Sequence, residues 1–366
     1  MNCVTVQVKP AAHEVLIESG LLREAGKRLL AALGGKPSHT AVVTAGPVRK
    51  HWEGALVASL KTAGLEPHVV EMRDGERYKT LSAVEELALK LVKRGADRNT
   101  VVLAFGGGVV GDVGGFLASV YMRGVRLAQI PTTFLAQVDA AIGGKTGVNL
   151  SAGKNLLGTF YQPQVVLIDP QVLSTLPERE YRAGLYEALK CGVIRNREIF
   201  DFMQRERERI LQRDTTALEW LITECVKVKA EIVAADERES DLRRILNFGH
   251  TIGHALESET AYRHFLHGEA VAWGMVAASM IAAGLHKTSA QTAQRIISAV
   301  LAYAPLPRVE ARSKSIARRI LSDKKTVDGV AHFVLPREIG EVEIVRNVPD
   351  RAVLQAIEEL RYLSRV

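Results

Sequence analysis

Strand and helix patterns alternate through the first half of the chain, and this alternation limits the possible folds more than any other feature. Short runs rich in β-branched residues are separated by segments with helical periodicity at 47–63 and 81–94. The expected strands are 40–44, Pro67–Met72, 101–105, 126–130 and 165–169. Because parallel strands need crossover helices, the pattern predicts a Rossmann-like, mostly parallel sheet with helices on both faces.

Strand patterns almost disappear after residue 177. Helical periodicity is found at 216–234, 251–259, 270–283, 290–302 and 352–363, with one short hairpin expected from 330–335 and 342–345. A chain of 366 residues is long enough for two domains. We therefore expect an α/β domain at 1–174, followed by an α-helical domain at 175–366.

Composition and charge narrow the class of protein. The formal net charge is +7, but basic residues alternate with acids, as at 205–209, which is typical of solvated helix faces. No nucleic acid partner is expected, and lysines beside glycines favour a small anionic substrate. The chain has no long apolar run, so no membrane partner is expected either. Cys3, Cys191 and Cys225 form no close pair, and residues 1–10 alternate like a strand rather than a signal peptide, which indicates a cytoplasmic protein.

A glycine-rich turn follows the strand that ends at Phe105. Gly106, Gly108 and Gly111 match the G-x-G-x-x-G pattern, whose backbone N–H groups can hold a pyrophosphate. The acidic residue usually found about 20 positions later is missing. The turn therefore disfavours a standard Rossmann domain but leaves open a dinucleotide site of another topology.

Polar residues in two other turns suit ligand binding. Asp74 and Glu76 follow the strand Pro67–Met72, where carboxylates can accept hydrogen bonds from ribose hydroxyls, although the same residues also suit an ordinary surface turn. Lys145, Lys154 and Asn155 lie in glycine-rich sequence that has little packing value. Their side chains suit hydroxyl and phosphate groups.

Three histidines indicate a metal site. His250 and His254 are four residues apart on one helix face, and His267 opens the next helix. A lone His-x-x-x-His pair would more often be a structural feature. With a third histidine and an upstream carboxylate, a divalent metal becomes the better interpretation.

Taken together, the ordered motifs resemble the 3-dehydroquinate synthase family of sugar-phosphate cyclases. The motifs are 106–115, 121–124, 139–155, 184–190, 243–254, 267–269 and 323–325. The resemblance implies a homodimer that uses NAD and one divalent metal, usually zinc, with cobalt as an alternative. Two positions depart from the family pattern: Ala140–Ala141 replace a common serine pair, and Ala45 stands where members often carry Asp or Asn.

The resemblance also implies roles for individual residues. The metal ligands would be Glu187, His250 and His267. Substrate contacts would come from Lys145, Lys154, Asn155, Lys190, Lys229, Arg243, Asn247, His254 and Lys324. NAD contacts would come from Asp74, Glu76, Lys79, Gly107, Gly108, Asp112, Thr132, Thr133 and Asp139, with Lys145 and Lys154 serving both ligands. Arg123 would reach the phosphate pocket of the partner subunit; without the resemblance, it would be read as a loop arginine paired with a nearby acid.

The implied reaction is the conversion of 3-deoxy-D-arabino-heptulosonate 7-phosphate to 3-dehydroquinate and phosphate, in the shikimate pathway to the aromatic amino acids. NAD would oxidise one ring hydroxyl transiently, phosphate would leave, and the carbonyl would be reduced again. Alternatives are a metal-dependent polyol or glycerol-phosphate dehydrogenase, a cyclase that makes an inosose or valiolone, and a non-catalytic anion- or nucleotide-binding protein. The large set of anion-binding residues favours the dehydroquinate reaction.

Overall fold

The computed structural model describes residues 1–8, 12–238, 242–323 and 332–365. The chain forms two compact units, each made of two segments. The first unit comprises Met1–Pro177 and Arg213–Glu237, and the second comprises Glu178–Gln212 and Arg238–Val366. The sequence suggests one boundary between residues 174 and 175, whereas the folded chain returns to its first unit after residue 212.

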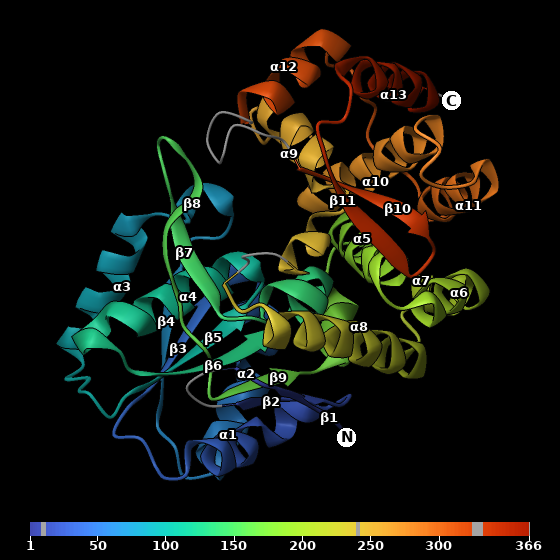
Figure 1. Ribbon diagram of the computed structural model, residues 1–366. Coiled ribbons are helices and arrows are strands. Elements are labelled where there is room, and N and C mark those ends of the chain that lie inside the picture. Colours follow the sequence, from blue (N-terminus) through green and yellow to red (C-terminus); the bar gives the residue numbers. More distant parts are fainter. Residues whose placement is uncertain (9–11, 239–241, 324–331, 366) are drawn as a thin grey trace. The chain divides into compact units, whose positions relative to one another are not determined.

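A seven-stranded sheet forms the centre of the first unit, in the order β1-β2-β9-β6-β5-β3-β4 (Figure 1). Only the β1–β2 pair is antiparallel, and the other pairs in this sheet are parallel. The strands are β1 (Asn2–Val6), β2 (His13–Ile17), β3 (Thr40–Ala45), β4 (Pro67–Met72), β5 (Val101–Gly106), β6 (Arg126–Pro131) and β9 (Val165–Ile168). The predicted fold class is confirmed.

Helices cover both faces of this sheet because its strands are apolar on both sides. Along β3, Ala41 and Val43 pack in one core with α3 (Leu81–Lys93) and α4 (Gly108–Val120). Val42 lies in the opposite core, with side chains from the other pair of helices. This second pair is α1 (Ala25–Leu33) and α2 (Gly46–Thr62). The arrangement places the glycine-rich turn between β5 and α4 at the carboxyl edge of the sheet.

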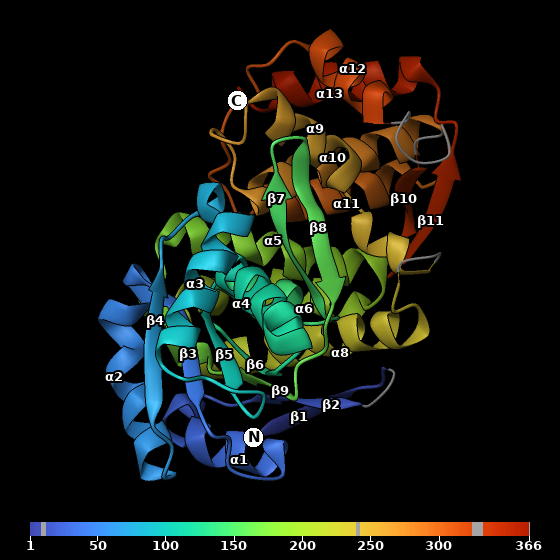
Figure 2. The ribbon, with the colours of Figure 1, turned by 90° about the vertical axis from the view of Figure 1, so that its left-hand side faces the viewer.

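A two-stranded antiparallel ribbon replaces the glycine-rich loop expected around residues 145–155. It consists of β7 (Lys145–Leu150) and β8 (Gly153–Phe160), shown in green in Figure 2. Gly147 and Gly158 allow the strands to approach closely, since a Cβ at residue 158 would lie 2.1 Å from the Thr146 carbonyl oxygen. The glycines that suggested a loop are therefore needed by the ribbon.

Helix α8 (Thr215–Ala235) belongs to the first unit, although it lies in the helical half of the sequence. The side chain of Asp214 caps it by accepting a hydrogen bond from Ala217 N, at 2.9 Å. The helix packs against β1 and against the π-helical turn η4 (Ala136–Ala140). It therefore brings Lys229 to the unit that carries the glycine-rich turn.

The second unit is helical with one hairpin, as expected. Its helices are α5 (Glu178–Ile194), α6 (Arg197–Arg205), α7 (Arg207–Leu211), η6 (Leu242–Asn247), α9 (His250–Glu259), α10 (His267–Gly284), α11 (Ala290–Leu301), α12 (Ser313–Asp323) and α13 (Asp350–Leu363). The hairpin pairs β10 (His332–Glu338) with β11 (Glu341–Arg346); residues 330 and 331 lie outside the described chain. Helix α10 packs against α5, α9, α11, α13 and β10. Within the described chain, no helix combines the length and apolar character needed to cross a membrane.

Candidate functional site

Helix α10 of the second unit packs very closely against α5 and against the residue that precedes α9, through two backbone contacts. A Cβ at Gly268 would lie 1.8 Å from the carbonyl oxygen of Ala183, in α5. A Cβ at Gly274 would lie 1.8 Å from the carbonyl oxygen of Gly249, which precedes α9. Both positions therefore require glycine, and their contacts hold α5, α9 and α10 at short distances.

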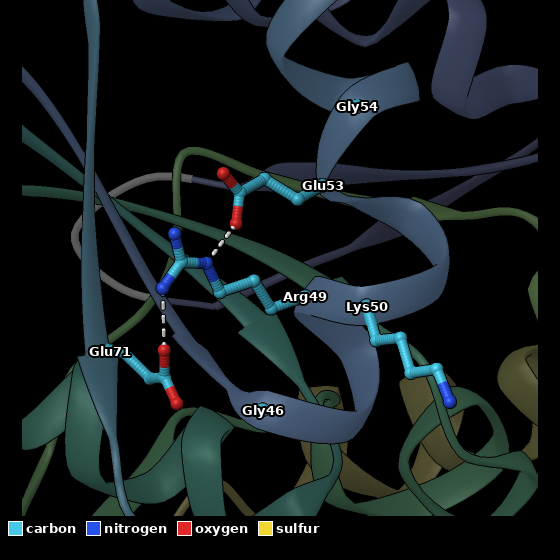
Figure 3. Close-up of a pocket in the computed structure, with 6 residues that line it drawn as sticks. All are labelled: Gly46, Arg49, Lys50, Glu53, Gly54 and Glu71. Carbon is cyan, nitrogen blue, oxygen red and sulfur yellow. Dashed lines mark hydrogen bonds and ion pairs between the residues drawn. The ribbon is translucent and has the colours of Figure 1, made fainter.

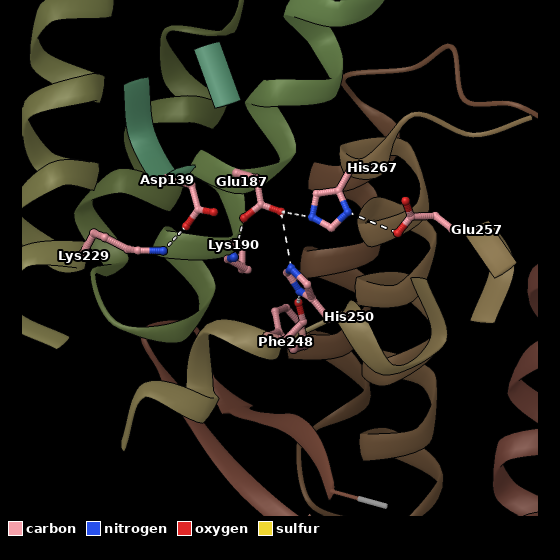
Figure 4. A network of polar contacts seen from close by, with 8 residues as sticks. All are labelled: Asp139, Glu187, Lys190, Lys229, Phe248, His250, Glu257 and His267. Carbon is pink, nitrogen blue, oxygen red and sulfur yellow. Dashed lines mark hydrogen bonds and ion pairs between the residues drawn. The ribbon is translucent and has the colours of Figure 1, made fainter. Parts of the chain in front are cut away.

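These three helices supply a carboxylate and two imidazoles that face one another (Figure 4). Glu187 comes from α5, His250 opens α9 and His267 opens α10. The Nε2 atoms of His250 and His267 lie 3.9 Å and 3.8 Å from Glu187 Oε1. One ligand atom from each residue lies within 4.8 Å of the others. A carboxylate with two histidines is a donor set that suits zinc and leaves positions open for a substrate.

Both imidazoles have their Nδ1 atom at hydrogen-bonding distance from an oxygen, and both direct Nε2 toward Glu187. His250 Nδ1 lies 3.2 Å from the carbonyl oxygen of Phe248, and His267 Nδ1 lies 3.2 Å from Glu257 Oε2. Burial, aided by the charge of Lys190, lowers the pKa of His250 well below its usual value. Burial opposes protonation of His267 too, but the Glu257 and Glu187 carboxylates outweigh it and raise the pKa. The neutral form of His250 leaves its Nε2 free to bind a metal.

The other described residues predicted for the second unit lie on α5, on α9 and on η6. His254 is exposed, and its ring centroid is 5.2 Å from that of His250 and 5.9 Å from that of His267. Lys190 forms a buried ion pair with Glu187. Arg243, which is almost fully buried, and Asn247 lie in η6, just before α9. Lys324 lies outside the described residues, so its predicted role stays a prediction.

A second carboxylate stabilises the start of α10. Glu269 accepts a hydrogen bond from the Leu266 backbone N–H at 2.8 Å, which satisfies a free donor of the first helical turn. Arg179 of α5 binds both oxygens of this carboxylate, at 2.7 Å and 2.8 Å. Arg179 also donates to the His264 carbonyl oxygen. Because α5 carries Glu187 and α10 carries His267, this bidentate pair helps set the spacing between them.

In the first unit, the predicted cofactor residues meet at the carboxyl ends of β5 and β6. Thr132 N donates to the Gly106 carbonyl oxygen at 3.0 Å, which joins the two strand ends. A Cβ at Gly107 would lie 2.9 Å from Thr133 Cγ2, and one at Gly108 would lie 3.5 Å from Ala140 Cβ. A glycine turn at a helix start, beside a threonine pair, offers backbone and hydroxyl donors to an anion.

A buried lysine links the turn after β4 to α4 and the ribbon. Lys79 contacts the carboxylate of Asp112 and the side-chain oxygen of Asn155. Asn149 joins the same group by accepting from the Asn155 backbone N–H at 2.8 Å, and it links Glu76 to the group by donating to Glu76 Oε1 at 2.7 Å. Burial raises the pKa of Asp112 to about 6, although Lys79 acts against this shift. Four residues predicted to contact a cofactor or substrate are thus brought together.

The remaining predicted residues of the first unit occupy different surroundings. Asp139 of η4 forms an ion pair with Lys229 of α8 (Figure 4). Lys145 and Asp74 are exposed, on β7 and after β4, and Lys154 is half-buried on β8. Arg123 is exposed in the short helix η3 (Tyr121–Arg123). The roles of these residues, like those of the other site residues, stay predictions.

A cavity of about 420 Å³ lies elsewhere in the first unit, beside the start of α2 (Figure 3). It is lined by Gly46, Arg49, Lys50, Glu53, Gly54 and Glu71. The Arg49 guanidinium reaches Glu53 at 2.5 Å and Glu71 at 2.7 Å. One of its lining residues, Gly46, comes directly after Ala45, which is one of the two positions that depart from the family pattern. None of the predicted site residues lines it, so we do not include it in the candidate site.

Comparison with known proteins decides the family. The family model described as 3-dehydroquinate synthase N-terminal matches residues 69–183, and the one described as 3-dehydroquinate synthase C-terminal matches 184–326. A protein of Koribacter versatilis (strain Ellin345) named 3-dehydroquinate synthase is 62% identical over 366 residues, covering 100% of both chains. The chain belongs to the 3-dehydroquinate synthase family.

Two solved structures are also similar to this family member. One is ValA, a 2-epi-5-epi-valiolone synthase from Streptomyces hygroscopicus subsp. jinggangensis 5008 with NAD⁺ and Zn²⁺ bound. It is 30% identical, with a TM-score of 0.88 and coverage of 97% of this chain and 98% of ValA. The other is 2-deoxy-scyllo-inosose synthase complexed with carbaglucose-6-phosphate, NAD⁺ and Co²⁺. It is 25% identical, with a TM-score of 0.87 and coverage of 98% and 99%.

The sequence reasoning that pointed to the 3-dehydroquinate synthase family missed several polar residues around the histidines. Glu257 follows His254 by three residues on one helix face, so its spacing could have suggested it. Glu269 occupies the third position of α10, where acidic residues often stabilise a helix start. Arg179 had no such signal, because its partner lies 90 residues away.

Proposed function

We propose that the chain converts 3-deoxy-D-arabino-heptulosonate 7-phosphate to 3-dehydroquinate and phosphate. The observation that carries this proposal is full-length identity of 62% to a protein named 3-dehydroquinate synthase, together with the Glu187, His250 and His267 cluster. An enzyme of this kind eliminates phosphate and is classed as a lyase. Identity to the valiolone and inosose synthases is much lower, at 30% and 25%, which supports the dehydroquinate reaction over theirs.

Zinc is the metal that the donor set suits best, with cobalt as an alternative. Both imidazoles hold Nδ1 against an oxygen and face Glu187 with Nε2, as required for two nitrogen ligands and one oxygen ligand. Bound there, the ion would polarise substrate oxygens, and NAD would accept and return a hydride. ValA holds NAD⁺ and Zn²⁺, which supports the same pair for this chain.

NAD is proposed to bind the first unit. The glycine turn at the start of α4, with Thr132 and Thr133 just after the adjoining strand β6, provides donors for the pyrophosphate. Asp112, Asp139 and the Asp74–Glu76 turn supply acceptors for hydroxyl groups. Lys79 is held by Asp112 and Asn155, so its charge lies in a defined position beside this turn.

The remaining residues would bind and orient an anionic sugar phosphate. Such a substrate carries a phosphate, a carboxylate and several hydroxyls, which calls for many fixed cations and amides. The proposed group is Lys145, Lys154, Asn155, Lys190, Lys229, Arg243, Asn247, His254 and Lys324. No nucleophilic side chain is required, because positioning and charge stabilisation accelerate the reaction.

The protein is further proposed to be a homodimer that completes its sites with Arg123 of the other subunit. Met122 and Arg123 both have left-handed backbone conformations, with φ of 48° and 71°, although neither is glycine. Such strain often accompanies function. Val120, Met122 and Phe160 are each at least 40% exposed, and Thr159 joins their segments by donating to Ser119. An exposed apolar group of this kind suits contact with a second copy.

We also place the protein in the cytoplasm. None of Cys3, Cys191 and Cys225 is disulfide-bonded in the structure. Scattered reduced thiols suit a reducing compartment, and a biosynthetic enzyme that depends on NAD needs access to the cytoplasmic pool.

One experiment tests the function directly. The purified protein is given the heptulosonate phosphate, NAD and zinc, and inorganic phosphate, dehydroquinate and NADH are measured. We expect equal amounts of phosphate and dehydroquinate, with no net NADH, because the hydride returns before the product leaves. Stoichiometric NADH would instead identify a dehydrogenase and contradict the proposal.

A further inference from the structure

Glu257 is a buried carboxylate next to a candidate metal ligand. It lies on α9 with 4% of its surface exposed, and its Oε2 atom is 3.2 Å from His267 Nδ1. The opposite ring nitrogen of His267 is the one that faces Glu187, at 3.8 Å. Glu257 is therefore in contact with the imidazole on the side away from the proposed metal.

We propose that Glu257 is a positioning residue that keeps the proton of His267 on Nδ1. A neutral imidazole has one N–H donor and one acceptor nitrogen, and an ionised carboxylate can only accept. Contact with Glu257 therefore makes Nδ1 the donor and leaves the Nε2 lone pair directed at Glu187. This inference rests on the zinc site proposed above and adds a residue to it.

The carboxylate has a second effect on the same ring. Its negative charge makes Nε2 a stronger electron-pair donor, and its fixed place in α9 limits rotation of the imidazole. Loss of such an outer partner commonly weakens metal binding roughly 10- to 100-fold. His250 has a neutral counterpart in the Phe248 carbonyl oxygen, at 3.2 Å. The two proposed histidine ligands are thus oriented by different groups, and only the group that orients His267 carries a charge.

In an alternative metal site, Glu257 and His267 would both be ligands, and this site must be distinguished from the proposed positioning role. His254, Glu257 and His267 also place one ligand atom each within 4.8 Å of the others. In that set Glu257 would bind the metal itself, and Nδ1 of His267 would carry the ion in place of a proton. Two features favour the positioning role: Nδ1 is at hydrogen-bonding distance from Glu257, and Nε2 faces a separate carboxylate.

The test measures zinc affinity of the metal-free protein by chelator competition near neutral pH. The variants are Glu257→Ala, Glu257→Gln and the matched control Glu259→Ala, which removes an acid from the same helix that pairs with Arg319 instead. We expect the zinc Kd to rise roughly 10- to 100-fold in Glu257→Ala. Glu257→Gln should weaken binding less, since an amide oxygen can still accept from Nδ1–H. Glu259→Ala should match the wild type.

A second measurement needs no metal. Nitrogen NMR of the metal-free wild type, at a pH high enough that the His267 ring is neutral, should show its one proton on Nδ1, and Glu257→Ala should shift that proton to Nε2. An unchanged Kd and an unchanged tautomer in the alanine variant would overturn the inference. If the alanine variant fails to fold, the wild-type tautomer decides, and a neutral His267 ring that carries its proton on Nε2 refutes the inference.

Two further variants separate the alternatives. If Glu257 is itself a ligand, Glu257→Gln and His254→Ala should both abolish zinc binding while Glu187→Ala retains it, and the inference fails. If the wild type does not bind zinc, the proposed metal site fails. The tautomer measurement still decides the role of Glu257 in that case.

Discussion

Gly268 of α10 meets Ala183 of α5 so closely that a side chain at residue 268 would overlap the backbone, with 1.8 Å between its Cβ and the Ala183 carbonyl oxygen. The contact lies one residue from His267 and four residues from Glu187. The close packing of α10 on α5 therefore also sets the distance between the proposed ligands His267 and Glu187. The glycine is needed for the geometry of the candidate metal site as well as for the fold.

Gly268→Ala is expected to lower the free energy of unfolding by roughly 1–3 kcal/mol or more, because the two backbones must separate. Zinc affinity should fall with it, as His267 moves away from Glu187. Thermal unfolding and chelator competition measure the two effects. Gly284→Ala is the control, since its Cβ would meet nothing within 4 Å at the end of the same helix. Wild-type zinc affinity in Gly268→Ala would contradict the prediction.

The ligand assignment makes a separate prediction. Glu187→Ala, His250→Ala and His267→Ala should each lose bound zinc, because each removes one of three protein ligands. His254→Ala should retain zinc but lose most of its activity, since this exposed imidazole is assigned to the substrate. Metal content of the purified variants, measured alongside phosphate release, gives the answer. Loss of metal from His254→Ala alone would show that the ligands have been assigned wrongly.

The proposed role of Arg123 can be tested with mixed dimers. Arg123→Ala and Lys190→Ala should each be almost inactive when pure. If Arg123 serves the partner's site, a mixed dimer has one site with an intact Lys190 and an intact Arg123. Random exchange of equal amounts should therefore recover roughly a quarter of wild-type activity. Continued inactivity after verified subunit exchange would place Arg123 in its own subunit's site or outside any site.

Buried His13 should make stability depend on pH. Burial lowers its pKa to about 4 from 6.5. The unfolded chain therefore binds the proton more readily, and stability is lost as the pH falls below about 6.5. We expect this group to remove about 2 kcal/mol of unfolding free energy between about pH 7 and pH 5. Urea unfolding of His13→Leu should show a smaller loss over this range, whereas exposed His51→Gln should resemble the wild type. Equal losses in wild type and His13→Leu would contradict the prediction.

Local patterns in the sequence predicted most of the sheet and helices. Strand β4 spans Pro67–Met72 as expected, and α11 ends one residue from its predicted end. Such elements follow from buried periodicity and from caps such as Ser289, whose hydroxyl accepts from Thr292 N. Both signals lie within a few residues of the element that they define, so the sequence alone contains them.

Features that depend on distant residues were harder to predict. The β7–β8 ribbon has glycines that indicate a loop until the facing strand is known. The contact between Glu257 and His267 joins two helices, and that between Arg179 and Glu269 joins residues far apart in sequence. The residues alone supplied the three histidines, His250, His254 and His267, whereas the family resemblance supplied Glu187 and the choice of His250 and His267 as the proposed ligands.

The position of α8 has a consequence for how the protein is made. Its helix covers β1 and the η4 turn, yet its residues are translated after Glu178–Gln212, which belong to the second unit. A ribosome that has released only residues 1–177 therefore presents a sheet whose first strand still lacks its covering helix. The first unit becomes complete only after residue 237 has emerged, by which time part of the second unit has already been synthesised.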